Sequence, residues 1–157
     1  LFALSKGEVF LDWIRELIEK KFYGENYKKG ANIAVTFRDL AKNLVIITTD
    51  LGNFESKEFS KAETPDYEIA SAIRISCCMP GLMKPVEYNN RLLVDGDLQK
   101  SWPMWKLSNS LKNCPDRILE FRLEGYYETN DISGIDYANA VYSCMTASST
   151  SFVNVPI

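Results

Sequence analysis

The first apolar pattern in the chain has the period of a helix. Ser5 and Glu8 have the spacing of a capping box, and Gly24 is typical of a residue that follows a helix. Between these signals, apolar side chains recur every three or four positions, at Val9, Phe10, Trp13, Ile14, Leu17, Ile18 and Phe22. The pattern predicts an amphipathic helix that starts near Glu8 and ends near Gly24.

Three runs of strand-forming residues follow a polar loop. They cover residues 32–37, 44–49 and 54–59, and Gly52-Asn53 marks the turn between the second and the third. The second run is apolar almost throughout, which is typical of a strand covered on both faces in a layered α/β sheet. We therefore expect an α/β fold.

A second helix and a hairpin are predicted further along the chain. Thr64-Pro65-Asp66 is a helix-start signal with Asp66 as the N-cap, and Pro80-Gly81 is expected to stop that helix. Residues 83–88 and 91–94 then flank Asn89-Asn90, a pair suited to a tight turn because Asn tolerates positive φ.

The last part of the chain predicts a helix over 103–111, a strand over 117–123 and a final helix within 135–152. The sequence contains no repeat and no linker. We therefore expect residues 1–157 to form one domain, or part of one.

Composition narrows the functional classes. With 157 residues, 46% hydrophobic and 25% charged, the chain is long and apolar enough for one globular core. A net charge of −3 gives no overall attraction to phosphate backbones, so a nucleic-acid partner is not expected. No apolar run is long enough to span a bilayer and no secretory leader opens the chain, which favours a cytoplasmic location.

The chain contains no His and four Cys, at positions 77, 78, 114 and 144. None of the cysteines forms a C-x-x-C pair, and without His neither a mixed zinc site nor a Ser-His-Asp triad can be completed. A mixed Cys and His zinc site is therefore not expected. Reduced, mostly buried thiols are predicted, and Cys77 and Cys78 are interpreted as packing residues because thiolates are favoured at the opposite end of a helix.

Asp95 is the candidate for chemistry. It leaves an apolar strand just before Gly96, and α/β sheets gather functional groups at the carboxyl ends of strands. Two other interpretations stay open: Asp95 as a plain turn residue, and Asp95 with Asp97 as ligands of a divalent metal, although no third ligand or phosphate loop accompanies them. Gly96 would supply either a positive φ or room for a close approach.

Several segments around Asp95 together resemble the patatin-like phospholipase family. They occur in the family's order and spacing between about residues 5 and 125, and the central motif region is 64–103. The segments are Thr48-Thr49-Asp50-Leu51, Thr64-Pro65-Asp66, Ala72-Ile73-Arg74-Ile75-Ser76, Met79-Pro80-Gly81, Lys84-Pro85-Val86 and Leu92-Leu93-Val94-Asp95-Gly96.

The resemblance implies a three-layer α/β/α sandwich and a Ser-Asp dyad that cleaves acyl esters of lipids. In the family, the Ser of a G-x-S-x-G elbow attacks the ester, and the Asp of a D-G-G or D-G-A motif orients and deprotonates it. Matched by position, that Asp is Asp95, and Gly96, Pro80 and Gly81 are supporting motif residues. The substrate class implied is a lipid or another acyl ester, and the resemblance implies no metal or organic cofactor.

Two positions depart from the family pattern. Asp97 replaces the usual Gly or Ala, and Ser101 replaces the usual Asn. A second carboxylate would raise the pKa of Asp95 if both faced the crevice, whereas an Asp97 that points to solvent would have little effect.

The nucleophile of such a dyad is absent from residues 1–157, which contain neither G-x-S-x-G nor a Gly-rich oxyanion loop. Because the chain opens with Leu1 rather than Met, we expect both to lie in an upstream portion and the 157 residues alone to be inactive. The alternative is a non-catalytic lipid-binding or interaction domain that kept the fold.

Three further features have both structural and functional interpretations. Asp50 is expected to be a strand-end or turn residue. The residues Trp102, Met104 and Trp105 are either core or a lipid-contacting patch. The basic residues Lys20, Lys21, Lys28 and Lys29 form either a solvated face or a weak peripheral contact with an anionic membrane.

Overall fold

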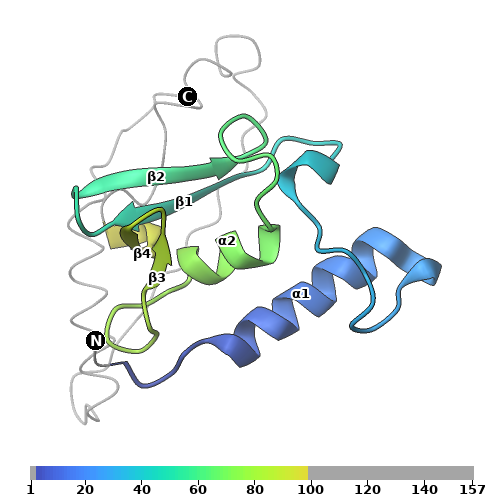
Figure 1. The fold of residues 1–157 in the computed structure, drawn as a ribbon, viewed down its shortest axis with the longest axis horizontal. Helices are drawn as coiled ribbons and strands as arrows, with labels where there is room; N and C mark the ends of the chain where they lie inside the picture. Colours follow the sequence, from blue (N-terminus) through green and yellow to red (C-terminus); the bar gives the residue numbers. More distant parts are fainter. Residues whose placement is uncertain (1–2, 99–157) are drawn as a thin grey trace, which may run out of the picture. The chain divides into compact units, whose positions relative to one another are not determined.

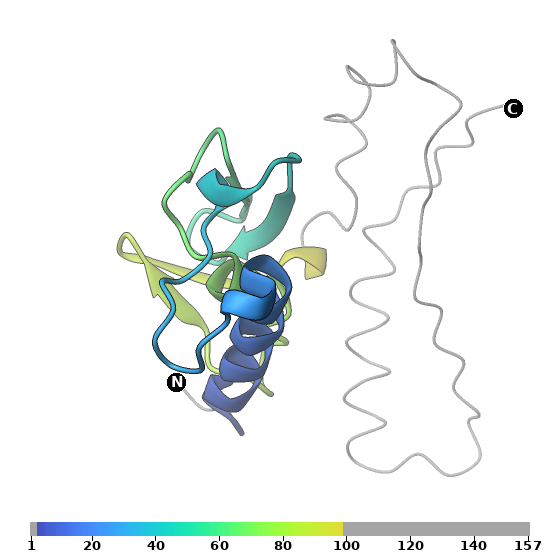
Figure 2. The ribbon, with the colours of Figure 1, turned by 90° about the vertical axis from the view of Figure 1, so that its right-hand side faces the viewer.

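The computed structural model describes residues 3–98, which form most of one structural unit, residues 1–99. The helices and strands predicted beyond residue 100 lie outside the described residues. Within 3–98, Figure 1 shows a small sheet, the short helix α2 (Ile69–Ser76) beside it, and the longer helix α1 (Glu8–Tyr23) on the other side of α2. Figure 2 shows the same elements after a quarter turn, with α1 in front.

The sheet has four antiparallel strands in the order β2-β1-β4-β3. Their bounds are β1 (Val45–Asp50), β2 (Glu55–Ser60), β3 (Val86–Tyr88) and β4 (Arg91–Asp95). The predicted second and third strands and the hairpin are thus confirmed, and Asn89 and Asn90 have the positive φ values, 49° and 60°, that a tight turn needs. The α/β class holds for this part of the chain, while a third layer stays a prediction.

The predicted strand over residues 32–37 is wrong. Val35 and Phe37 are buried, but their segment pairs with residues 65–69 instead of joining the sheet: Ile69 N–H donates to the Val35 carbonyl at 3.0 Å. Thr36 then caps the short helix η2 (Phe37–Asp39), with its backbone N–H bound to the Asp39 carboxylate at 2.8 Å. An apolar alternation therefore reflected core contacts without a sheet.

The two predicted helix starts also need correction. Ser5 does not cap α1, because its hydroxyl accepts the N–H of Gly7, and Gly7 itself is the N-cap. The second helix starts at Ile69 with Glu68 as N-cap, since Asp66 instead forms an exposed ion pair with Arg38 at 2.8 Å. A cap signal in the sequence marks the neighbourhood of a helix end, and tertiary partners decide the residue.

The core lies where α2 meets the sheet. Buried apolar side chains from α2, three strands and the 35–37 segment form one cluster, and Tyr67, Tyr88 and Phe59 stack at its edge with ring centroids 4.7–5.3 Å apart. The cluster consists of Val35, Phe37, Ile46, Phe59, Ile69, Ala72, Ile75 and Leu93.

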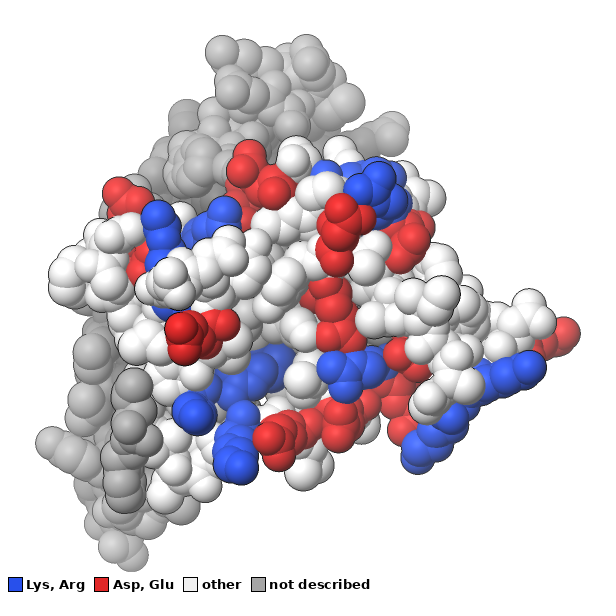
Figure 3. All heavy atoms as spheres, viewed as in Figure 1, with Lys and Arg blue, Asp and Glu red and all other residues white. Residues whose placement is uncertain are grey.

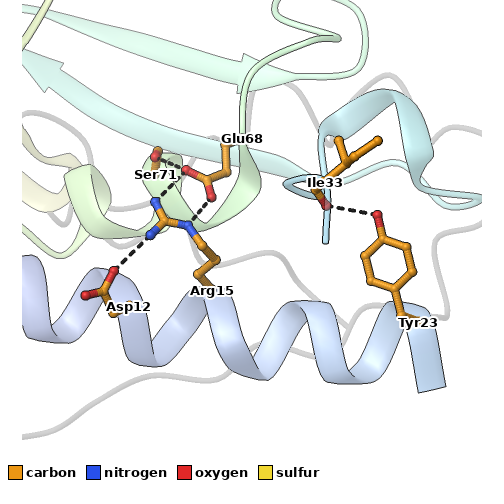
Figure 4. Close-up of polar contacts among 6 residues, drawn as sticks. All are labelled: Asp12, Arg15, Tyr23, Ile33, Glu68 and Ser71. Atoms are coloured by element: carbon orange, nitrogen blue, oxygen red, sulfur yellow. Dashed lines mark hydrogen bonds and ion pairs between the residues drawn. The ribbon is translucent and has the colours of Figure 1, made fainter. Parts of the chain in front are cut away.

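Helix α1 faces α2 with charged side chains. Arg15 binds the Glu68 carboxylate through Nε at 2.6 Å and Nη2 at 3.2 Å, and the Ser71 hydroxyl donates to the same carboxylate (Figure 4). Burial alone would raise the pKa of Glu68, but these hydrogen bonds lower it. The seam between the helices is therefore held by a compensated carboxylate.

The predicted apolar face of α1 is only partly covered: Ile18 packs against the core cluster, while other side chains of this face are exposed. Val9 is 86% exposed, Trp13 56% and Leu17 46%. Lys20, Lys21, Lys28 and Lys29 are all exposed, and Glu16 pairs with Lys20 at 2.6 Å and Lys29 at 3.5 Å. Figure 3 shows acidic and basic side chains intermingled over α1 and α2, so this face has no field of one sign.

Candidate active site

Asp95 is the last residue of β4 and lies opposite Thr48 of β1. Its backbone N–H donates to the Cys78 carbonyl at 3.0 Å, just beyond α2. Its half-buried side chain accepts the N–H of Asp97 at 3.0 Å through Oδ1. Among residues 3–98, no Lys or Arg forms an ion pair with Asp95, so its second oxygen is not neutralised by a described cation.

Gly96 is buried against the backbone of β1 and opens the short helix η3 (Gly96–Leu98). A Cβ at this position would lie 2.9 Å from the Ile47 carbonyl carbon and closer still to its oxygen. The φ of Gly96 is not positive. Of the two roles predicted for this glycine, close approach of the backbone is therefore the correct one, and it brings Asp95 to a fixed distance from β1.

Pro80 and Gly81 are exposed and form the centre of a turn that starts at Met79. Leu82 N–H donates to the Met79 carbonyl at 3.2 Å, and Gly81 has a φ of 85°. Proline at the second position and a positive-φ glycine at the third are the requirements of a type II turn. The helix itself ends four residues before Pro80, at Ser76, so this pair redirects the chain and does not stop the helix.

Arg74 of α2 binds two other segments, one that precedes α1 and one that follows the turn. The side chain is 5% exposed, and its Nη2 donates to the carbonyls of Lys6 at 2.6 Å and Lys84 at 2.7 Å. Gly7 leaves room for the guanidinium, because a Cβ there would lie 2.9 Å from two of its nitrogens. Arg74 thus joins α2 to the segments of Lys6 and Lys84. This is a structural role for the arginine of the sequence pattern.

Asp97 interacts with Asp95. Burial raises the pKa of the Asp97 carboxyl, and the negative charge of Asp95 raises it further. The residue is exposed overall, yet it does not behave as an isolated surface carboxylate. Which of the two alternatives considered for Asp97 holds, an influence on Asp95 or little effect, stays a prediction.

The neighbouring cysteines differ. Cys78 is fully buried, as predicted, and its thiol donates to the Lys84 carbonyl at 3.4 Å. Cys77 is exposed, against the prediction, because α2 ends at Ser76 and leaves Cys77 in the turn beside the two carboxylates. Although the residue is exposed, its thiol is partly buried. This burial, and then the charges of Asp95 and Asp97, raise the pKa of Cys77, which disfavours a nucleophilic thiolate.

Asp50 is the last residue of β1, in agreement with the expected strand-end position. Its carboxylate is buried, accepts the N–H of Gly52 at 2.8 Å and pairs with Arg91 at 3.1 Å. A hollow of about 500 Å³ lies beside it, between the β1–β2 and β3–β4 turns. Since Arg91 begins β4 and Asp95 ends it, this hollow lies at the opposite end of the strand from the candidate site.

Residues 3–98 contain no cluster of three or more side chains placed to hold a metal ion. In the same range, no helix is long and apolar enough to cross a bilayer. Some residues named in the sequence analysis lie outside the described residues, and their predicted roles stay predictions. They are Ser101, Trp102, Met104, Trp105, Cys114 and Cys144.

Comparison with known proteins gives two viral relatives. An uncharacterized protein of Acanthamoeba polyphaga mimivirus is 32% identical over 96 residues, which cover 61% of this chain and 31% of the viral protein. A probable lipid hydrolase of Invertebrate iridescent virus 6 is 26% identical over 80 residues, 48% of this chain and 28% of that protein. The chain thus spans less than a third of the length of these relatives.

The family comparison covers the region built around Asp95. The sequence model of the patatin-like phospholipases matches residues 2–104, well over half of the chain. That range includes α1, the whole described sheet and α2 with the turn that follows it. The chain belongs to the patatin-like phospholipase family.

Proposed function

We propose that this chain supplies the aspartate of a Ser-Asp dyad in a lipid acyl hydrolase, with Asp95 as the base partner. The nucleophilic Ser would come from a segment of a longer protein outside these 157 residues. The substrate class is an ester-linked acyl chain of a lipid. The observation that carries the proposal is the placement of Asp95, half-exposed at a strand end and anchored through its own backbone.

In this reaction Asp95 must accept a proton from the Ser hydroxyl, and its placement at the strand end suits that role. The Ser hydroxyl adds to the ester carbonyl carbon while its proton passes to the Asp95 carboxylate. The ester C–O bond then breaks, the leaving alcohol takes a proton, and water releases the acyl group from Ser in a second addition. A carboxylate without a described cationic partner keeps an oxygen available to accept that proton.

Support for a lipid substrate comes from the family and from the viral relative named as a probable lipid hydrolase. Peripheral contact with a membrane surface is part of the same proposal, since an enzyme of this type meets its substrate at a lipid interface. The chain by itself should have no turnover, because neither a G-x-S-x-G elbow nor a His-based alternative occurs in it.

The test is a matched pair of substitutions in the longer protein that carries this chain, assayed on phospholipid vesicles and on a short-chain acyl ester. Asp95→Asn should lower kcat by several orders of magnitude at unchanged melting temperature, as loss of a base partner does. Asp97→Asn, the same change two residues away, should stay within a few-fold of wild type.

Two results would contradict the proposal. Near-normal turnover of Asp95→Asn would remove Asp95 from the mechanism. Vesicle binding by a wild-type protein without any hydrolysis would support the alternative, a non-catalytic lipid-binding domain.

A further inference from the structure

Ser76 links the end of α2 to the strand opposite Asp95. It is the last residue of the helix, and its hydroxyl donates to the Ile47 carbonyl of β1 at 2.7 Å. The two residues are 29 positions apart in the sequence. The proposed function assigns no role in catalysis or binding to the Ser76 hydroxyl.

The Ile47 carbonyl is the group against which Gly96 packs. The β1–β4 ladder ends at the pair Thr48 and Asp95, so Ile47 and Gly96 are the first residues beyond it. The space between them is too small for a Cβ. Any rotation of the Ile47 peptide must therefore move Gly96, and with it the neighbouring Asp95.

The end of α2 supports Asp95 and Gly96, the corner at which β4 ends, from the other side. Cys78, two residues after Ser76, accepts the backbone N–H of Asp95 at 3.0 Å. The Thr49 hydroxyl adds a long hydrogen bond, 3.5 Å, to the Gly96 carbonyl. Asp95 and Gly96 thus lie between β1 and the helix end, and Ser76 is the side chain that ties those two supports to each other.

We propose that Ser76 is a positioning residue, which orients the Asp95–Gly96 corner through the Ile47 carbonyl. The hydroxyl fixes one peptide plane, that plane sets the position of Gly96, and Gly96 sets the direction in which the Asp95 carboxylate leaves the strand. Small displacements of a catalytic group cost rate disproportionately, because proton transfer requires a short, aligned contact. The consequence for rate rests on the proposed function, whereas the consequence for geometry does not.

The geometric part is tested on the 157-residue chain by amide hydrogen exchange. Ser76→Ala should speed exchange in the peptides that cover 45–50 and 93–98. Ser71→Ala is the matched control, since this second serine of α2 donates to Glu68 instead, and it should leave both peptides unchanged. Ser76→Cys, close in size but a weak donor, should reproduce the Ala result, and Ser76→Thr should restore wild-type exchange.

The kinetic part uses the same variants in the longer protein. Ser76→Ala and Ser76→Cys should lower kcat by roughly 10- to 100-fold with KM within twofold, a size expected for a catalytic group displaced by up to about 1 Å. Ser76→Thr should recover most of the rate, and Ser71→Ala should keep wild-type kcat.

The two parts fail separately. Unchanged exchange in 93–98 for both Ser76→Ala and Ser76→Cys would overturn the positioning role whatever the kinetics show. Altered exchange with unaltered kcat would keep the geometric link and instead count against Asp95 as the catalytic base. A fall in kcat that Ser76→Thr does not rescue would overturn the proposal, because it would show that the hydroxyl is not the group responsible.

Discussion

The two ends of β4 carry carboxylates in opposite situations. At the start of the strand, Asp50 of β1 is buried and neutralised by Arg91, and it also accepts backbone N–H groups of the following turn. At the end of the strand, Asp95 is half-exposed, accepts one backbone N–H and has Asp97 as a charged neighbour. A carboxylate whose negative charge is neutralised by a cation and by N–H donors suits a structural role. A carboxylate whose charge is only partly neutralised suits a role in which it exchanges a proton.

The largest stability change should come from closing the space beside Asp95. Gly96→Ala forces a methyl group against the Ile47 carbonyl, and we expect a loss of about 3 kcal/mol in the free energy of unfolding, typical of strong overpacking. Urea denaturation measures it. The matched substitution at the other end of β4 is Gly52→Ala, whose Cβ would meet only the Asp50 carboxylate at 3.3 Å, and it should cost less than half as much.

Asp50 should matter more for stability than its exposed partner. Asp50→Asn removes the charge that neutralises Arg91 and disturbs the buried acceptor of the Gly52 N–H, and we expect a loss of about 1–3 kcal/mol. Arg91→Gln should cost less, because the Arg91 side chain is 50% exposed and water can replace its role. Equal losses, measured in the same urea experiment, would mean that the ion pair itself dominates.

Glu68, the N-cap residue of α2, is a further carboxylate that is neutralised by an arginine, Arg15. Glu68→Gln should destabilise the fold by about 1–2 kcal/mol at neutral pH through loss of charged hydrogen bonds to Arg15. Because the folded-state pKa of Glu68 lies below its ordinary value of 4.5, its contribution is present above that pH and is lost as the pH falls through the folded pKa. The gap between wild type and variant should therefore narrow below pH 4.5 in thermal melts.

The smallest effect should be a gain. The folded-state pKa of Asp97 is raised above its ordinary value of 3.8, so ionising this group costs stability as the pH rises through that window. Asp97→Asn should raise the melting temperature slightly at pH 7 and show no advantage below pH 3.8. A lower melting temperature at pH 7 would mean that the ionised Asp97 makes a favourable contact that outweighs its repulsion from Asp95.

The turn and the strand end of β4 could be predicted from adjacent residues, whereas the catalytic role of Asp95 stays a prediction. Asn89-Asn90 and Asp95-Gly96 are local signals, since a tight turn and a strand end each depend on adjacent residues. Cys77 was misjudged because its exposure depends on where α2 ends, and Ser76 was recognised only as part of a motif. Its partner, Ile47, lies on a distant strand, and no spacing in the sequence reports that contact.

The same limit explains the error at residues 32–37. Val35 and Phe37 alternate as they would in a strand, but their backbone partners lie in the segment before α2. Periodicity reports which side chains are buried, and it does not report which segment supplies the hydrogen bonds. The exposed apolar side chains of α1 are a related case, because an amphipathic pattern does not say which of its members reach the core.

The contacts around Asp95 also bear on the order of folding. Thr49 reaches Gly96 across 47 positions and Ser76 reaches Ile47 across 29, so the corner is made of non-local contacts. Such contacts close large loops and form slowly. During synthesis, β1 and α2 emerge well before Asp95, and the corner can assemble only after β4 has been added between β1 and β3. A pause in translation before that point would leave β1 with an unpaired edge, which is a recognised route to aggregation.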